Sequence, residues 1–170
     1  MPRPRVGVII GTVREGRFAD VPAQWLLELG RRREDVALEL VDLRDYPMEL
    51  YGTTASPSDA VRRWRRTINA LDGYIFLVAE YNHSIPGVLK NAIDHADAGF
   101  RRKPAGFVGY GGLGAARAVE HLRMILVELE VAPLRHAVHI GGSTFLALSS
   151  GQRAPSDVQH LEERAMTMLD

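Results

Sequence analysis

Five short apolar runs alternate along the chain with longer segments in which apolar residues recur at helical spacing. The runs cover residues 6–10, 36–43, 74–78, 105–108 and 137–140. A run that stays apolar without a polar break is typical of a parallel strand buried on both faces of its sheet. Strands that alternate in this way with helices predict an α/β fold built on a parallel sheet.

The segments between the runs are predicted helices. They cover residues 18–33, 58–71, 85–96, 114–130 and a last stretch from about 156 onwards. In the third of them, the apolar positions 88, 89, 92, 93 and 96 share one side, as in a helix that packs on a sheet. Five parallel strands with these helices favour the strand order 2-1-3-4-5, in which a ligand binds beyond the carboxyl ends of the strands.

The composition narrows the range of partners. With 170 residues, 46% of them hydrophobic, the chain can form one substantial core, and we expect residues 1–170 to be a single domain. The 21 basic and 21 acidic residues cancel, so the net charge favours neither nucleic acid nor a membrane surface as partner. The sequence contains no cysteine, which excludes disulfides, thiol catalysis and thiolate metal sites. The apolar run after Arg5 is too short for a signal peptide or a membrane span, so we expect a cytoplasmic protein.

The loop after the first predicted strand has the composition of a phosphate site. It reads Gly11-Thr12-Val13-Arg14-Glu15-Gly16-Arg17. Free backbone N–H groups and the positive end of the following helix attract an anion there. We expect Thr12, Arg14 and Arg17 to add hydrogen bonds. The Gly-Lys-Ser/Thr ending of a triphosphate-binding loop is missing, so a terminal monophosphate fits better.

The loop after the third predicted strand is suited to a flat heterocycle, because it offers backbone donors and acceptors beside side chains that can hold one face of a ring. It reads Glu80-Tyr81-Asn82-His83-Ser84. Ser84 also has a structural explanation, as the N-cap of a helix that carries Pro86 in its first turn. Further along, Lys90, Asn91 and Asp94 are expected to lie on the helix surface or to brace a loop.

The loop after the fourth predicted strand is rich in glycine. It reads Gly109-Tyr110-Gly111-Gly112-Leu113-Gly114 and formally matches the GxGxxG dinucleotide fingerprint. We reject that interpretation, because the fingerprint belongs to the first strand–helix turn of a Rossmann unit. Glycine instead allows the main chain to come close to a ligand ring, which a Cβ atom would obstruct. A glycine-rich turn with a purely structural role is the alternative.

Three segments, in this order, resemble one protein family. Residues 80–94, EYNHSIPGVLKNAID, resemble the second flavin loop of the NAD(P)H-dependent FMN reductase family, whose fold is flavodoxin-like. The first loop resembles the family's GSxRxxS phosphate loop, with Thr12 in place of serine and Arg17 at a position that is commonly small and polar. The third resembles its SYGGxGGxRA segment, with Gly109 in place of serine. The resemblance covers roughly residues 5–140 and implies a flavodoxin-like three-layer sandwich.

The resemblance also implies FMN as the cofactor and NADPH or NADH as the electron donor. The flavin then carries the chemistry, so we expect no catalytic side chain and no metal. The residues implied to bind FMN are Gly11, Thr12, Arg14, Arg17, Glu80, Tyr81, Asn82, His83, Ser84, Tyr110, Gly111 and Gly112. The implied electron acceptors are small molecules: quinones, azo dyes, free flavin or metal oxyanions. A homodimer or homotetramer is implied too, with residues 44–57 as a candidate subunit contact.

Other functions remain as alternatives. A flavodoxin-like electron-transfer protein would bind FMN without oxidising NAD(P)H, but flavodoxins are typically strongly acidic and this chain is neutral. A flavin-free protein that kept the fold is a third alternative. A hydrolase is disfavoured because the GxSxG nucleophile elbow is missing. A zinc site at His136 and His139 is disfavoured because residues three apart on a strand face opposite sides.

Overall fold

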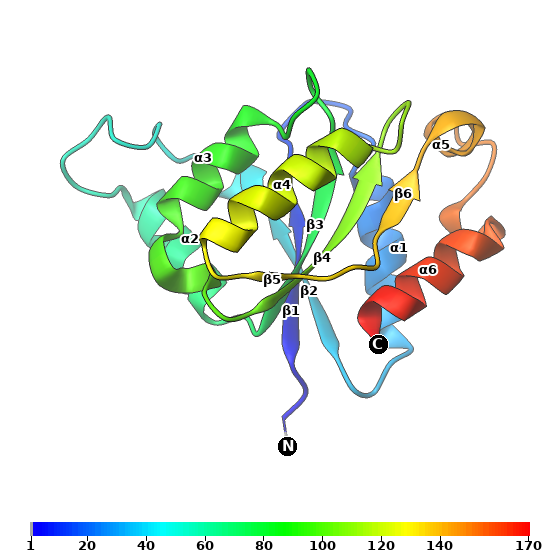
Figure 1. Cartoon of the computed structure of the whole chain (residues 1–170), viewed down its shortest axis with the longest axis horizontal. Helices are drawn as coiled ribbons and strands as arrows, with labels where there is room; N and C mark the ends of the chain where they lie inside the picture. Colours follow the sequence, from blue (N-terminus) through cyan, green and yellow to red (C-terminus); the bar gives the residue numbers. More distant parts are fainter. Residues whose placement is uncertain (1) are drawn as a thin grey trace.

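The computed structural model describes residues 2–170, and residue 97 is described by its backbone alone. In this part of the chain, six parallel strands form one sheet in the order β2-β1-β3-β4-β5, with β6 also paired to β4 (Figure 1). The strands are β1 (Arg5–Ile10), β2 (Ala37–Asp42), β3 (Gly73–Ala79), β4 (Pro104–Tyr110), β5 (Ala132–Pro133) and β6 (Val138–Ile140). The predicted strand order 2-1-3-4-5 is confirmed.

Two short strands share the fifth position of the sheet. β5 pairs with the first two residues of β4, and β6 pairs with its last three. The predicted strand at residues 137–140 corresponds to β6. β5 was not predicted, because two residues that include a proline form no apolar run.

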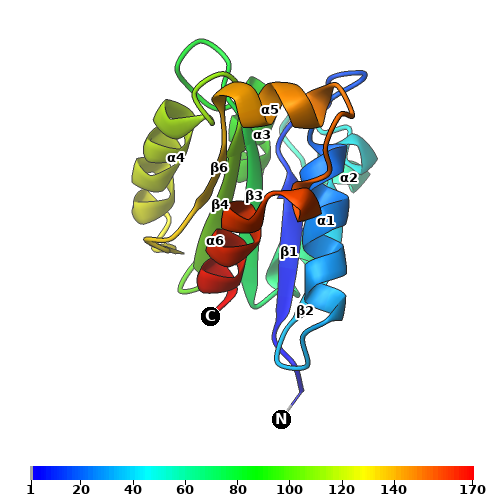
Figure 2. The same cartoon turned by 90° about the vertical axis from the view of Figure 1, so that its right-hand side faces the viewer.

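Helices cover both faces of the sheet (Figure 2). They are α1 (Asp20–Arg31), α2 (Asp59–Asn69), α3 (Gly87–His95), α4 (Ala116–Glu128), α5 (Gly142–Ser149) and α6 (Gln159–Leu169), with short 3-10 helices η1 (Leu43–Asp45), η2 (Asp97–Phe100) and η3 (Pro155–Asp157). α1 and α6 pack on one face, and α2, α3 and α4 on the other, which gives the predicted three layers. Within residues 2–170, no helix is long and apolar enough to cross a membrane.

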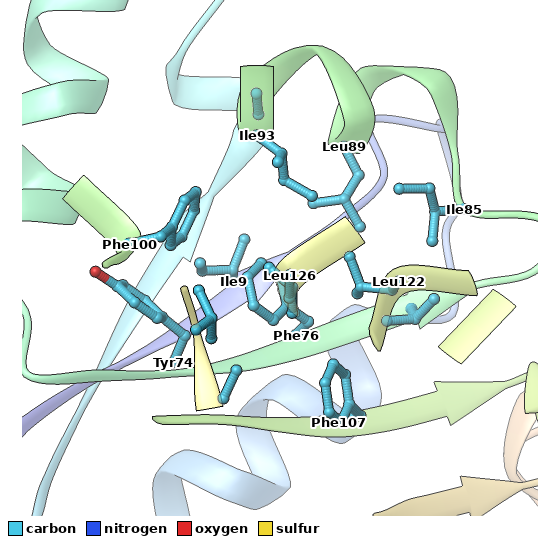
Figure 3. Close-up of a cluster of buried hydrophobic side chains, with 14 of the residues drawn as sticks. Ile9, Tyr74, Phe76, Ile85, Leu89, Ile93, Phe100, Phe107, Leu122 and Leu126 are labelled. Carbon is cyan, nitrogen blue, oxygen red and sulfur yellow. The ribbon is translucent and has the colours of Figure 1, made fainter. Parts of the chain in front are cut away.

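The central strand β3 explains why its sequence is apolar throughout. Phe76 and Val78 belong to the core under α2, α3 and α4, whereas Ile75 and Leu77 belong to the core under α1 and α6. Every residue of β3 is buried, because both faces of the strand are covered. Figure 3 shows the first of these cores, in which Phe76 lies among aromatic side chains such as Phe107 of β4 and aliphatic side chains from α3 and α4.

The topology places a crevice at one end of the sheet. The chain leaves β1 towards α1 on one face and leaves β3 towards α3 on the other, so the two connections diverge. Ligands of open α/β sheets bind at such a divergence. Helix α5 lies at the same end, where β6 finishes (Figure 2). The other five helices correspond to the predicted ones, whereas α5 was not predicted.

Candidate active site

A cavity of about 340 Å³ opens at the carboxyl ends of β1, β3 and β4. Its lining residues come from the loops after these three strands and from α5. The predicted site residues among them are Thr12, Arg14, Arg17, Glu80, Tyr81, Tyr110 and Gly111. The structure therefore brings residues of all three predicted loops around one space. Gly11, Asn82, His83, Ser84 and Gly112 adjoin these residues along the chain but do not line the cavity.

Thr12 joins the first loop to the second. Its side chain is buried, and its Oγ1 accepts a hydrogen bond from the backbone N–H of Arg14 at 3.3 Å. The same Oγ1 lies 3.0 Å from the hydroxyl of Tyr81. The preceding Gly11 must be glycine, because a Cβ atom there would lie 2.9 Å from the carbonyl oxygen of Leu77. The loop after β1 therefore lies directly against the end of β3.

The guanidinium of Arg17 forms its hydrogen bonds within the protein, so none of its donors is left free for a ligand. A guanidinium has five N–H donors, and here all five are used. Nε and Nη2 bond Asp20 at 2.9 and 2.7 Å, and Nη1 bonds the carbonyl of Thr12 and Asp42, both at 2.7 Å. Nη2 also bonds Asp42. The hydrogen bond to Asp42 above all raises the pKa of Arg17. Arg17 thus fixes the shape of the first loop, a role different from the predicted phosphate contact.

Arg14 is the cation of the first loop that keeps its guanidinium available. It is exposed at the cavity, and no carboxylate of the described residues lies within ion-pair distance of it. The carbonyl of Arg14 accepts a hydrogen bond from Nη2 of Arg44 at 2.5 Å. Arg44, which follows β2, was not among the predicted site residues and secures this loop from outside. No local pattern in the sequence pairs residues 30 positions apart.

The second loop begins with a tight turn at Tyr81–Ser84. The backbone N–H of Tyr81 donates to the carbonyl of Ser84 at 2.9 Å, and the N–H of Ser84 donates to that of Tyr81 at 3.1 Å. Asn82 and His83, between them, have φ values of 50° and 69°. Positive φ at both central residues is the property of a type I′ turn. The turn presents Asn82 and His83 to solvent at the end of the sheet.

Ser84 does not cap the following helix, so that prediction is wrong. Helix α3 begins at Gly87, its N-cap residue is Pro86, and no side chain caps it. The hydroxyl of Ser84 instead lies 2.7 Å from Nδ1 of His121 on α4. The tight turn separates Ser84 from the helix start, and this separation could not be read from a serine that precedes a proline.

Glu80 is an ionised anchor. Its carboxylate accepts hydrogen bonds from Nε of Arg117 at 2.5 Å and from the backbone N–H of Ala118 at 3.5 Å. Burial alone would raise the pKa of Glu80, but the hydrogen bonds and charge of Arg117 outweigh burial and lower the pKa. The same guanidinium bonds Nε2 of His83 at 2.7 Å. Glu80 therefore ties the second loop to the start of α4.

The glycine loop after β4 leaves open space beside its backbone. Gly111 has a φ of 136°, which favours glycine, and a Cβ atom on Gly111 or Gly112 would meet no atom of the described residues within 4 Å. Gly109 is different, because a Cβ atom there would lie 2.4 Å from the carbonyl oxygen of Gly114. Packing thus excludes a serine at position 109 without a backbone shift. At Gly111, which lines the cavity, the missing side chain leaves room for a ligand.

An aromatic wall closes the side of the cavity next to α5. The rings of Phe18 and Tyr110 lie 5.3 Å apart, and Phe145 of α5 lies 5.0 Å from Phe18, edge-on. The hydroxyl of Tyr110 is buried and has no hydrogen-bond partner among the described residues. Burial above all raises its pKa, so the hydroxyl is protonated at neutral pH. Phe145 and Ser149 line the cavity but were not among the predicted site residues. They follow the predicted strand at residues 137–140, and this position indicated the same end of the sheet.

The long loop between η1 and α2 is braced by α3. Asn91 donates from Nδ2 to the carbonyl of Glu49 at 2.9 Å and accepts from the N–H of Tyr51 at 2.8 Å. His95 donates from Nε2 to the same carbonyl at 2.8 Å. Lys90 forms an ion pair with Asp94 on the surface of α3. The predicted roles of Asn91, which braces a loop, and of Lys90 and Asp94, which lie on the helix surface, are confirmed. The loop extends away from the sheet, in cyan at the left of Figure 1.

The two histidines near β6 lie away from this cavity. His136 and His139 both line a second cavity between α4, β6 and α6, so the expectation that they face opposite sides is wrong. His136 precedes β6, so its side chain does not follow the alternation of side chains between the two faces of that strand. His139 bonds the carbonyl of Gly114 through Nδ1 at 2.8 Å. The described residues contain no group of three or more side chains placed to hold a metal ion.

Comparison with known proteins gives concordant matches. The family model for NADPH-dependent FMN reductase matches residues 4–145. An NAD(P)H-dependent FMN reductase of Pseudomonas aeruginosa is 38% identical over 135 residues, covering 74% of this chain and 71% of that protein. A quinone reductase of Pseudomonas putida is 30% identical over 158 residues, covering 86% and 83%. A flavoenzyme NAD(P)H:acceptor oxidoreductase from Paracoccus denitrificans is similar in fold, with a TM-score of 0.71 and 23% identity over 97% of this chain and 98% of that one.

Proposed function

The chain belongs to the NADPH-dependent FMN reductase family, and we propose on that basis that it is an FMN-dependent oxidoreductase. It takes hydride from NADPH or NADH and reduces a small-molecule acceptor, namely a quinone, an azo compound, a flavin or a similar molecule. The observation that carries the proposal is the meeting of three separate loops around one cavity at the carboxyl ends of β1, β3 and β4. The relatives are reductases, which favours this function over an electron carrier that does not oxidise NAD(P)H.

The cavity has features that fit FMN. Its volume of about 340 Å³ falls in the range of small-molecule sites. The buried hydroxyl of Tyr110 lacks a partner among the described residues, so a ligand with an acceptor atom would satisfy it. Arg14 brings to the cavity a positive charge that no carboxylate of the described residues neutralises, which suits a phosphate. The open space beside Gly111, which lines the cavity, accommodates a ring close to the backbone.

We assign the parts of the cofactor to the three loops. The phosphate is held by Arg14, by Thr12 and by the backbone N–H groups of the loop that Gly11 begins. Arg17 acts indirectly, because its five donors are already bonded within the protein. Of the remaining predicted residues, Glu80 and Tyr81 from the second loop and Tyr110 and Gly111 from the third line the cavity and face the ring system. Asn82, His83, Ser84 and Gly112 adjoin them along the chain and shape the two loops.

FMN, when bound, supplies the redox chemistry and passes electrons from the nicotinamide nucleotide to the acceptor. The contribution of the chain is to bind and orient. Arg117 and Glu80 satisfy each other, so no titratable group of this pair is left to donate a proton to a substrate. Phe18, Tyr110 and Phe145 form an apolar wall that excludes water from one side of the cavity.

The wider setting is part of the proposal. Residues 1–170 act as a single FMN-binding domain, which the continuous sheet with both faces covered supports. We propose a homodimer or homotetramer, with the extended loop at residues 44–57 as a subunit contact. A cytoplasmic location suits a chain with no cysteine, and its neutral charge gives no reason to expect a nucleic acid or membrane partner.

Oxidation of NADPH and of NADH tests the activity. FMN-loaded protein is mixed with either nucleotide and with a benzoquinone, an azo dye or free riboflavin. In anaerobic solution, the proposal predicts nucleotide loss beyond one equivalent per bound FMN only when both the protein and the acceptor are present. Protein without FMN, and FMN without protein, are the controls. Rates no higher than those with free FMN alone would contradict the proposed function.

A further inference from the structure

Two side chains of α4 hold the turn at residues 81–84 from outside the cavity. Nε of Arg117 donates to Glu80 at 2.5 Å, and its Nη1 donates to Nε2 of His83 at 2.7 Å. One turn of helix further on, Nδ1 of His121 lies 2.7 Å from the hydroxyl of Ser84. Arg117 and His121 do not line the cavity. Neither residue was among the predicted site residues.

The turn needs such support because its backbone is disfavoured. Asn82 and His83 both occupy the left-handed region, with φ values of 50° and 69°. That region is unfavourable for residues other than glycine, although asparagine and histidine enter it more often than most. Two backbone hydrogen bonds between Tyr81 and Ser84 close the turn. The links to α4 hold the chain at three points: Glu80 before the turn, His83 within it and Ser84 at its end.

We propose that Arg117 and His121 are positioning residues that hold the 81–84 turn in its FMN-binding conformation, and that protonation of His83 loosens this hold. The inference rests on the proposed function, because it concerns the same cofactor. It extends that function by making FMN affinity depend on contacts outside the cavity and on pH.

The pH dependence follows from hydrogen-bond chemistry. A guanidinium has donors and no acceptor, so Arg117 can bond Nε2 of His83 only when that nitrogen is unprotonated. Protonated His83 has no acceptor and would place a second positive charge beside Arg117. Histidine gains its proton in mildly acidic solution. The carboxylate of Glu80 offsets part of the added charge, and His121 holds the neighbouring Ser84, but neither restores the lost bond.

Variants of His121 give the cleanest test, since this residue is exposed and its loss should not unfold the protein. His121→Ala removes the bond to Ser84 and should weaken FMN binding about 2–12-fold, the range for one neutral hydrogen bond. His121→Asn places an amide near the position of Nδ1 and should recover most of the affinity. His160→Ala, an exposed histidine on α6, is the matched control and should bind FMN like the wild type.

Variants of Arg117 and His83 test the other link. Arg117→Lys keeps a positive charge beside Glu80, but a single ammonium group cannot bond Glu80 and His83 together. The FMN affinity of Arg117→Lys should therefore fall, but less than that of Arg117→Ala. His83→Gln keeps an acceptor that does not titrate. The phosphate of FMN itself titrates near pH 6, so the quantity compared is the ratio of Kd values at about pH 5.5 and about pH 8. This ratio should be smaller in His83→Gln than in the wild type.

The experiment is a titration of the apo protein with FMN, followed by quenching of flavin fluorescence and by the circular dichroism of the bound flavin. Folding of each apo variant is checked by far-ultraviolet circular dichroism. Wild-type affinity in folded His121→Ala and Arg117→Lys, or an unchanged pH ratio in His83→Gln, would overturn the inference. Failure of the wild type to bind FMN would instead overturn the proposed function, so the two failures are distinguishable.

Discussion

Replacing Arg17 by alanine tests whether this residue shapes the first loop rather than binding the ligand. Its side chain is 3% exposed and lies between Asp42, 17% exposed, and Asp20, 53% exposed. In the variant, the one hydrogen bond that Asp42 keeps within residues 2–170 comes from the backbone N–H of Arg44, at 3.0 Å. Asp20 can be hydrated, because half of its side chain is already in solvent.

The magnitude follows from these exposures. Removal of one partner from a buried ion pair destabilises a protein by about 3–5 kcal/mol. Since one of the two carboxylates here is half exposed, we expect the lower end, about 3 kcal/mol. Domains unfold with about 5–15 kcal/mol in total, so Arg17→Ala should lose a large fraction of the stability of the apo protein before any cofactor is added.

Urea denaturation of the apo proteins measures this loss. The matched control is Arg14→Ala, which removes a guanidinium from the same loop but leaves no carboxylate unpaired, and should unfold within about 0.5 kcal/mol of the wild type. Arg17→Ala/Asp42→Asn should recover part of the stability, because it removes the uncompensated charge. Wild-type stability of Arg17→Ala would refute the role assigned to the five bonded donors.

Three further predictions concern the same cavity. Arg14→Ala should weaken FMN binding about 10–150-fold, the worth of one hydrogen bond to a charged group, and an unchanged Kd by flavin titration would remove Arg14 from the phosphate site. Tyr110→Phe removes a buried hydroxyl that has no partner among the described residues. Apo stability should therefore hold or rise by up to about 1 kcal/mol, while FMN binding weakens about 2–12-fold; a clear loss of apo stability would contradict this. Burial would raise the pKa of Asp42, but the hydrogen bonds from Arg17 and Arg44 lower it below its ordinary value. The stability that ionised Asp42 adds to the fold is therefore complete above its pKa in the unfolded chain, about 3.9, and is lost as pH falls through its lower pKa in the folded protein. Between about pH 6 and pH 3, the urea midpoint should therefore fall more steeply in the wild type than in Asp42→Asn.

The sequence predicted those parts of the fold that depend on local patterns. The apolar run at 74–78 and the helical spacing at 85–96 reflect burial on a sheet, and both correspond to elements of the structure. Helix α5 was missed because Gly142–Ser149 is rich in glycine, serine and threonine and carries no apolar stripe. Its Leu146 is 66% exposed, so hydrophobic periodicity could not reveal the helix.

The sequence was enough to predict which loops form the candidate site, but not the role of each residue in them. The three loops follow their strands in the expected order, and this places them at one edge of the sheet. The hydrogen bonds that occupy the guanidinium of Arg17 depend on Asp42, which lies 25 residues away at the end of another strand. Likewise the link from Ser84 to His121 spans 37 residues. Such pairings arise from tertiary packing and leave no signature in the local sequence.

The visible spectrum of the protein tests the central claim most directly. Purified protein is saturated with FMN, desalted, and examined before and after anaerobic addition of NADPH or NADH. The account predicts that a flavin spectrum is retained and that it bleaches when the nucleotide is added. A retained spectrum that neither nucleotide bleaches would contradict the reductase function, and loss of all flavin on desalting would contradict a tight FMN site formed by the three loops.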